Sequence, residues 1–247
     1  MSGPQQDTHG EPSAQDSGTT AGTNDLAVQL AEAARDLQGR RDPEQVMARI
    51  VATAVALVPG AEDATITIAR GRRHVRSAAA TGDRPRAFDA LQDELGQGPC
   101  LDALYESRTV RVDDLPTDDR WPALGARAPE IAVRSLLCLQ LFVEGDALGA
   151  LDCVSGQPSA FTDESEQVGL LLASHASVAV ADAQQLGHLS AALASRDVIG
   201  QAKGILMERF RITADQAFNV LAKVSQDSNR KLHQVAEELA ATGTLTR

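Results

Sequence analysis

The segment RSLLCLQLFVEGDALGALDCVS, residues 134–155, decides how the first part of this chain folds. It contains two apolar runs, Arg134–Val143 and Ala147–Ser155, each of a length that strands have. The residues between them, Glu144-Gly145-Asp146, are polar and few, as in the turn of a hairpin. The segment therefore predicts two neighbouring antiparallel strands.

Shorter strands are predicted upstream of this hairpin. Ala64–Arg70 alternates isoleucine with threonine, Thr109–Asp113 alternates valine with polar residues, and Val75–Ala80 is a run of small residues. Between these strands we expect a helix near Arg86–Leu95 and an irregular stretch over Leu115–Pro129. The strands and the internal helix together indicate one mixed domain.

Helices are predicted on both sides of the strands. The first has apolar residues at helical spacing, namely Leu26, Leu30, Ala33, Ala34 and Leu37. A second begins at Pro43, a residue favoured in the first turn of a helix. A long helix begins after the capping signature Thr162-Asp163-Glu164 and extends to Gln185. Helices around an antiparallel sheet form an α+β domain, which we place at residues 25–182.

The two ends of the chain have different compositions. Residues 1–24 are mostly Gly, Ser, Thr, Gln and Pro, and we expect a disordered tail because they cannot bury enough apolar surface. Residues 183–241 are predicted to form an all-α domain of three helices, followed by a short tail at 242–247. The predicted core residues of these helices are, in order, Val198, Ala202, Ile205 and Leu206, then Ala217, Phe218, Val220, Leu221 and Val224, then Leu232, Val235, Ala236 and Leu239.

Two pairs of basic residues in this helical part are candidates for binding an anion. Arg196 and Lys203 are seven residues apart, so they point only about 20° apart and more than about 90° away from the apolar stripe. Gly200 lies on the same outer side, where a glycine costs roughly 1 kcal/mol of helix stability and indicates close approach of another group. We also expect Arg230 and Lys231 in the first turn of the third helix, where cations oppose the helix dipole unless an anion binds there.

The net charge of −11 argues against wrapping duplex DNA, but the charge is uneven. Residues 25–182 hold 15 basic and 25 acidic residues, whereas residues 183–247 hold 8 basic and 6 acidic residues. Only the C-terminal part is electrostatically compatible with a polyanion. The aromatic content of 3% disfavours an aromatic platform for stacked bases.

The three cysteines, Cys100, Cys138 and Cys153, lack CxxC spacing, which argues against a disulfide framework and a thiolate zinc site. Cys138 and Cys153 lie in apolar runs and are expected in the core. Cys100 follows Gly98-Pro99 at an apparent helix start, which can lower the pKa of a thiol, so a redox role stays open for it. Acidic residues at 113–119 fit a solvated loop better than a metal site. We expect neither a metal nor a cofactor.

The order of elements in residues 25–182 resembles a GAF domain, with Gly96-Gln97-Gly98-Pro99-Cys100-Leu101 before a strand and Leu148-Gly149-Ala150-Leu151 near the end. This resemblance implies a sensor of a small molecule or of redox stress that signals through its terminal helices. It does not indicate which ligand is bound.

The run Ala192–Met207, together with Ala217-Phe218, Leu221 and Asn229-Arg230-Lys231-Leu232, resembles the ANTAR domain. ANTAR domains bind paired RNA hairpins as dimers and act as transcription antiterminators, and hairpin loops expose base edges that an A-form duplex hides. The RNA-binding residues that the resemblance implies are Arg196, Gln201, Lys203, Asn229, Arg230 and Lys231. Arg211 and Ser225 depart from the family pattern, where glycine and alanine are usual, and are expected to affect packing and not the RNA face.

The sequence therefore predicts a signal-responsive, homodimeric transcription antitermination regulator that binds RNA hairpins. The alternative is a sensor that acts through protein partners without contacting nucleic acid. No set of nucleophile, base and orienting residue supports an enzyme. The sequence has no secretory signal and no apolar stretch long enough to span a membrane, so a cytoplasmic location is expected.

Overall fold

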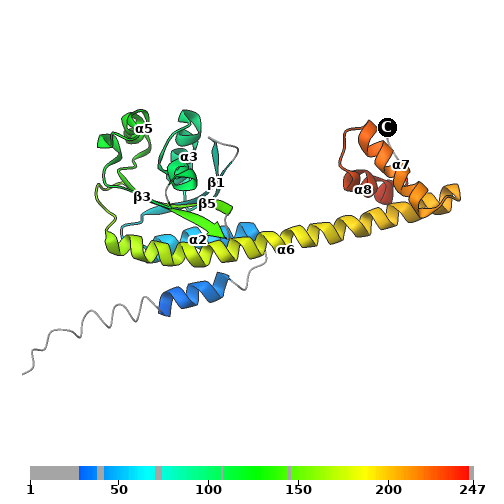
Figure 1. Ribbon diagram of the computed structural model, residues 1–247, viewed down its shortest axis with the longest axis horizontal. Coiled ribbons are helices and arrows are strands. Elements are labelled where there is room, and N and C mark those ends of the chain that lie inside the picture. The colour runs from blue at the N-terminus through cyan, green and yellow to red at the C-terminus, as the bar shows by residue number, and fades with distance from the viewer. Residues whose placement is uncertain (1–27, 38–41, 70–73, 107, 144–145, 245–247) are drawn as a thin grey trace, which may run out of the picture. The chain divides into compact units, whose positions relative to one another are not determined.

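The computed structural model describes residues 28–37, 42–69, 74–106, 108–143 and 146–244. They belong to two compact units, the first ending at Ala181 and the second beginning at Asp182 (Figure 1). The predicted tail at residues 1–24 lies outside the described residues. No helix within the described ranges is both long and apolar enough to cross a membrane.

The first unit contains a five-stranded antiparallel sheet. Its strands, in the order in which they lie in the sheet, are β2 (Val75–Ala80), β1 (Asp63–Ala69), β5 (Asp146–Ser155), β4 (Ser135–Val143) and β3 (Thr109–Val112). The predicted hairpin is confirmed, because β4 pairs with β5 along its whole length. The pairing register shifts between Leu141 and Phe142, so β5 carries one extra residue there.

Both faces of the sheet are covered, which explains why β4 and β5 read as nearly continuous apolar runs. In Figure 1, α2 and α6 run along one face, and α3 and α5 lie over the other. Side chains alternate between these faces, so Leu137 and Leu139 meet α6 near Gly169. Leu136 and Cys138 join the apolar core on the opposite face.

Helices α2 and α6 begin where the sequence indicates, whereas Leu26, in the first turn of the first predicted helix, lies outside the described residues. A helix over residues 28–37 buries Leu30 and Leu37. Helix α2 (Pro43–Leu57) has Pro43 in its first turn, and the carboxylate of Asp42 accepts a hydrogen bond from the Glu44 N–H. The hydroxyl of Thr162 and that of Ser165 cap the start of α6 reciprocally.

The opposite face is covered by short helices. These are α3 (Asp83–Leu95), α4 (Pro99–Tyr105), η1 (Leu115–Thr117), α5 (Pro122–Arg127) and η2 (Ala128–Ile131). The prediction of an irregular stretch over Leu115–Pro129 is therefore wrong, because three short helical pieces lie within or across it. Each of these pieces has a proline in its first turn, where the fixed φ of proline favours a helix start.

Helix α6 (Asp163–Phe210) is 48 residues long and contributes to both units. The sequence predicts a helix to Gln185 that runs on toward the first helix of residues 183–241, and the structure joins the two into one helix. The residues after Gln185, Leu186-Gly187-His188-Leu189, contain no proline, so nothing interrupts the backbone hydrogen bonds.

The second unit is completed by α7 (Ala214–Asp227) and α8 (Leu232–Thr242). The predicted capping box is confirmed, with Thr213 and Gln216 each bonding the other's backbone N–H. Buried residues of the core are Ala202, Leu206, Ala217, Leu221, Val235, Ala236 and Leu239. The prediction that Phe218 and Val220 belong to this core is wrong, since they are 41% and 38% exposed.

Candidate functional site

Arg196 and Lys203 lie on one outward stripe of α6, as their spacing predicts. Arg196 is exposed and Lys203 is half-buried, while Ala202 and Leu206 face the core of the second unit. Gly200 also faces outward, and a Cβ added to it would meet nothing within 4 Å. The glycine therefore leaves open space on the surface between the two cations.

The same stripe carries exposed apolar side chains at both of its ends. Leu189 precedes Arg196 by seven residues and Phe210 follows Lys203 by seven, so all four point in nearly the same direction. Leu189 is 58% exposed and Phe210 is 59% exposed. Leu186, Leu193 and Met207 are exposed beside this line. The surface is therefore cationic in its middle and apolar at its ends.

Most cations of the second unit are engaged by groups of the same unit. Arg209 donates to the Gly243 carbonyl at 2.5 Å, and ion pairs join Arg211 to Glu208, Lys223 to Asp227 and Arg230 to Glu238. Among residues 182–244, the basic side chains left without such a contact are Arg196, Lys203 and Lys231. All three belong to the predicted RNA-binding set.

Gln201 does not join Arg196 and Lys203. It is exposed, but it points about 140° away from Arg196 around the helix. There it lines a surface pocket with Gly204, Glu208 and Ala240. Gln201 therefore lies on a different side of α6 from a ligand that binds over Arg196 and Lys203.

The turn between α7 and α8 holds the other three predicted residues. Asn229 adopts a left-handed backbone conformation with φ of 51°, which asparagine tolerates better than most residues. The prediction that Arg230 and Lys231 lie in the first helical turn is wrong, because α8 begins at Leu232 and Lys231 is its N-cap. The Gln234 side chain accepts a hydrogen bond from the Lys231 N–H.

The two departures from the family pattern have separate structural effects. Arg211 has φ of 55°, the left-handed conformation in which a glycine is unstrained. The Ser225 hydroxyl donates to the Arg230 carbonyl at 2.5 Å. The expectation that Ser225 stands apart from the predicted RNA-binding residues is therefore wrong, since it fastens the backbone of one of them.

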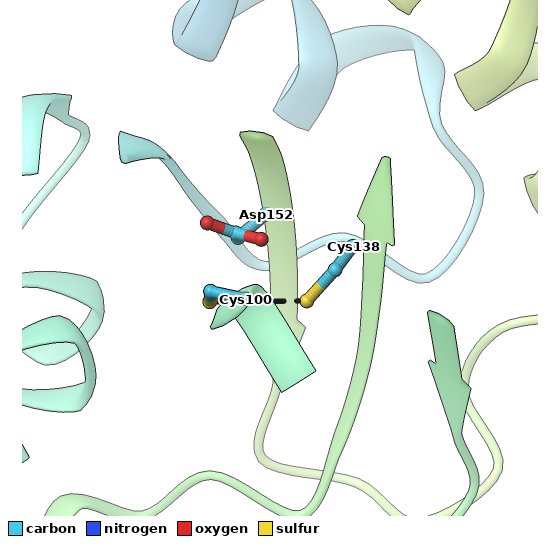
Figure 2. A group of neighbouring side chains, drawn as sticks. All are labelled: Cys100, Cys138 and Asp152. Carbon is cyan, nitrogen blue, oxygen red and sulfur yellow. Dashed lines mark hydrogen bonds between the residues drawn. The ribbon is translucent and has the colours of Figure 1, made fainter. Parts of the chain in front are cut away.

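A second candidate site is buried in the first unit, where Cys100, Cys138 and Asp152 converge (Figure 2). One donor atom from each of the three lies within 4.8 Å of the others, and the two sulfur atoms are 3.9 Å apart. Cys138 is directly opposite Asp152 in the β4–β5 pairing, and Cys100 comes from the start of α4. All three side chains have no solvent exposure.

A second buried carboxyl, that of Asp89 on α3, lies close to this group. Its Oδ2 accepts hydrogen bonds from the hydroxyls of Thr65 and Ser77, while Asp152 Oδ2 accepts from Thr67. The remaining oxygen of each carboxyl, Oδ1, has no hydrogen-bond partner within the described part of the chain. Such groups are uncommon in protein interiors and call for an explanation.

Burial controls the ionisation of this group. Desolvation raises the pKa of Asp89 well above its usual value, and repulsion from Asp152 raises it further. Burial likewise raises the pKa of Asp152 and the pKa of the Cys100 thiol. The position of Cys100 at a helix start therefore does not make it a reactive thiolate, because desolvation is the larger effect.

Gly98 and Gln92 position Cys100. The Gln92 Oε1 accepts a hydrogen bond from the Cys100 N–H at 2.9 Å, and its Nε2 donates to the Cys100 Sγ at 2.8 Å. Gly98 has φ of 149°, and a Cβ on it would lie 2.3 Å from the Gln92 Oε1. Glycine is therefore required here for the Gln92 amide to reach the cysteine.

The acidic residues at 113–119 do not form a metal site in the described structure. Asp114 forms an ion pair with Arg134 at 2.6 Å, and Asp118 forms one with Arg120 at 2.7 Å. These pairs hold the pKa of each carboxyl below its usual value. Asp114 and Asp118 therefore have structural partners.

Comparison with known proteins gives a family for each unit. The family model described as GAF domain matches residues 40–181, and the one described as ANTAR domain matches residues 187–239. No curated protein matches the chain. GAF domains are small-molecule sensors and ANTAR domains are RNA-binding antitermination domains, and both are regulatory.

Solved structures share the fold of the first unit. The GAF domain of a phosphoenolpyruvate-protein phosphotransferase from Coxiella burnetii is 17% identical with a TM-score of 0.53, covering 66% of this chain and 96% of its own. The corresponding Acinetobacter domain is 15% identical with a TM-score of 0.54, covering 67% and 98%. Free methionine-R-sulfoxide reductase from Neisseria meningitidis, solved with its substrate, is 20% identical with a TM-score of 0.52, covering 65% and 93%. At these identities the likeness concerns the fold alone.

Proposed function

Because the chain belongs to the GAF domain family and carries an ANTAR domain after it, we propose that it is a signal-responsive transcription antitermination regulator that binds RNA hairpins. The sensor comprises residues 25–182 and the RNA-binding part residues 183–241. One observation carries this proposal. The described cations of the second unit that lack an intramolecular contact are Arg196, Lys203 and Lys231, which are residues that the ANTAR pattern assigns to RNA.

Unpaired cations at these positions suit a phosphate backbone. Arg196 and Lys203 lie about 10 Å apart along α6, at a rise of 1.5 Å per residue. A nucleic-acid strand that follows the helix can therefore meet both, and Gly200 leaves room between them. Lys231 is the N-cap of α8, and the start of a helix favours an anion. Asn229 offers an amide for base edges exposed in a hairpin loop.

The proposed regulator is a homodimer. Leu186, Leu189 and Leu193 form an exposed apolar stripe on α6 just before Arg196, and a second copy of the same helix is an occupant that matches its spacing. The pairing ends at Arg196, because two like charges facing each other would be unfavourable. Changing Leu189 and Leu193 to glutamate is expected to lower the mass measured by light scattering toward that of one chain.

The test compares two double variants that each remove one arginine and one lysine. Arg196→Gln with Lys203→Gln removes the unpaired cations, whereas Arg211→Gln with Lys223→Gln removes cations that are already paired. The probe is a pool of RNAs with two tandem hairpins and randomised loops, titrated against the full chain at several salt concentrations.

The first variant should bind the pool more weakly, with the slope of log K against log salt reduced by about 2. The matched variant should bind as the unchanged protein does. If both variants bind alike, the stripe does not contact RNA. The exposed leucines favour the rival function, a sensor acting through protein partners, and an unchanged protein that dimerises but does not retain the pool would establish it.

A further inference from the structure

The buried group in the first unit can bind a ligand whether or not the second unit binds RNA. We propose that Cys100, Cys138 and Asp152 bind a thiophilic divalent metal ion of the Zn²⁺ class. The sequence does not indicate this site, because the three residues lack metal-ligand spacing and come from α4, β4 and β5. The cross-strand register and the placement of α4 bring them together.

The distances suit such an ion. Tetrahedral zinc with Zn–S bonds of about 2.3 Å holds two thiolate sulfurs about 3.8 Å apart. The Cys100 and Cys138 sulfurs are 3.9 Å apart, and an oxygen of Asp152 lies within 4.8 Å of both. The three side chains thus need no large movement to coordinate one ion, and they leave a fourth position for an exogenous ligand.

An unpartnered polar atom points to a cation independently of the sulfur spacing. Asp152 is fully buried, and its Oδ2 accepts a hydrogen bond from Thr67 whereas its Oδ1 has no hydrogen-bond partner among the described residues. The thiols of Cys138 and Cys100, the other two proposed ligands, also interact with this carboxyl. An unsatisfied carboxyl oxygen in an apolar interior is costly. A bound cation supplies the missing partner and compensates the desolvated charge.

The donor types select among ions. Two sulfurs and one carboxylate are unsuitable for Mg²⁺ or Ca²⁺, which prefer six or more oxygen ligands. Sulfur ligands favour zinc and other thiophilic metals. A disulfide between Cys100 and Cys138 is a poorer interpretation, because the sulfurs, 3.9 Å apart, would have to approach to about 2 Å and the Asp152 oxygen would stay unsatisfied.

The surroundings also fit thiolate ligation. The Gln92 Nε2–H already donates to the Cys100 sulfur, and such donors stabilise a thiolate bound to a metal. Binding requires that both thiols and the Asp152 carboxyl lose their protons to solvent, since only the deprotonated groups coordinate. A bound ion would identify the class of ligand that the GAF domain senses. Any effect of the ion on RNA binding rests on the proposed function.

The test uses the full chain, freed of metal by a chelator and kept under a non-coordinating reductant, and titrated with Co²⁺. We expect one Co²⁺ per chain, with a near-ultraviolet thiolate-to-cobalt band and the visible bands of a four-coordinate ion, all removed when Zn²⁺ is added. A folded, reduced protein that shows no such bands overturns the proposal whatever the variants do.

Variants then assign the ligands. Cys100→Ser and Cys138→Ser should each abolish or strongly shift the charge-transfer band, and Asp152→Asn should weaken Co²⁺ binding roughly tenfold or more. Cys153→Ser is the matched control, because Cys153 is equally buried but adjacent to Asp152 on β5 and so faces the other side of the sheet. If Cys153→Ser loses the band and Cys138→Ser keeps it, the site is wrongly placed.

Thermal unfolding keeps the test decisive if a serine variant folds poorly. Zn²⁺ should raise the melting temperature of the unchanged protein and of Cys153→Ser, and it should raise that of Asp152→Asn much less. Equal stabilisation of all three would overturn the assignment of Asp152. RNA binding takes no part in these measurements, so their failure is distinguishable from failure of the proposed function.

Discussion

Arg230 and Glu238 form an ion pair, with 2.5 Å between the guanidinium Nη1 and the carboxylate Oε2. Glu238 is on α8, and Arg230 lies just before that helix begins. This ion pair engages Arg230, one of the cations to which the ANTAR pattern assigns RNA binding. Glu238 therefore competes with phosphate for Arg230, whereas Lys231 beside it has no such competitor among the described residues.

Glu238→Gln is expected to strengthen binding of the two-hairpin RNA pool several-fold, because it frees Arg230 and removes a negative charge near the turn. Glu237→Gln is the control, since it makes the same change at the neighbouring, exposed position of α8. Filter binding at two salt concentrations measures both. Equal effects of the two substitutions would mean that only net charge matters and that Arg230 does not contact RNA.

Arg211→Gly is expected to stabilise the protein by up to about 1 kcal/mol, because glycine adopts the left-handed conformation at φ of 55° without strain. Arg211→Ala also removes the exposed ion pair with Glu208 but keeps a Cβ, so it separates the two effects. Urea unfolding gives the free energies. A glycine variant no more stable than the alanine variant would show that the turn is unstrained.

The pKa of Asp89 predicts a pH dependence of stability. Burial and Asp152 raise the pKa of Asp89 in the folded state, so the folded protein holds this proton at pH values where the unfolded chain has lost it. The free energy of unfolding should therefore fall as pH rises above about 4, the unfolded value. Asp89→Asn should reduce this fall and be more stable than the unchanged protein at neutral pH.

Urea unfolding from pH 5 to pH 8 with a chelator present measures this difference, which should widen as pH rises. Asp83→Asn, at the exposed start of the same helix, serves as the control. If Asp89→Asn and the unchanged protein follow parallel curves, Asp89 is ionised in the folded state.

The sequence predicts the strands and helices well where an apolar period is clear. The predictions are wrong where the packing of neighbouring helices or the backbone conformation of a turn determines the outcome. Phe218 and Val220 look like core residues, yet Ala217 and Leu221 define the buried face of α7 and leave both exposed. The start of α8 is misplaced because Asn229 takes a left-handed conformation, which ends any helix that would include it.

The RNA-binding residues and the buried cluster differ in how far a sequence can reveal them. Arg196 and Lys203 share one helix, so helical geometry alone places them together. Cys138 and Asp152 meet only because the register shifts between Leu141 and Phe142. A regular ladder continued from Val143 would place Leu151 opposite Cys138, and the bulge that prevents this has no clear signature in the sequence.

The alternation of side chains along β4 and β5 determines which sequence changes would remove the buried site. The backbone pairing of β4 does not depend on the side chain of Cys138, so a substitution by another small residue removes a sulfur donor and keeps the sheet. An insertion of one residue between Gly149 and Asp152 would instead turn the carboxyl to the other face. A point substitution at Cys138 would therefore remove one proposed ligand while the strand register of the domain is kept.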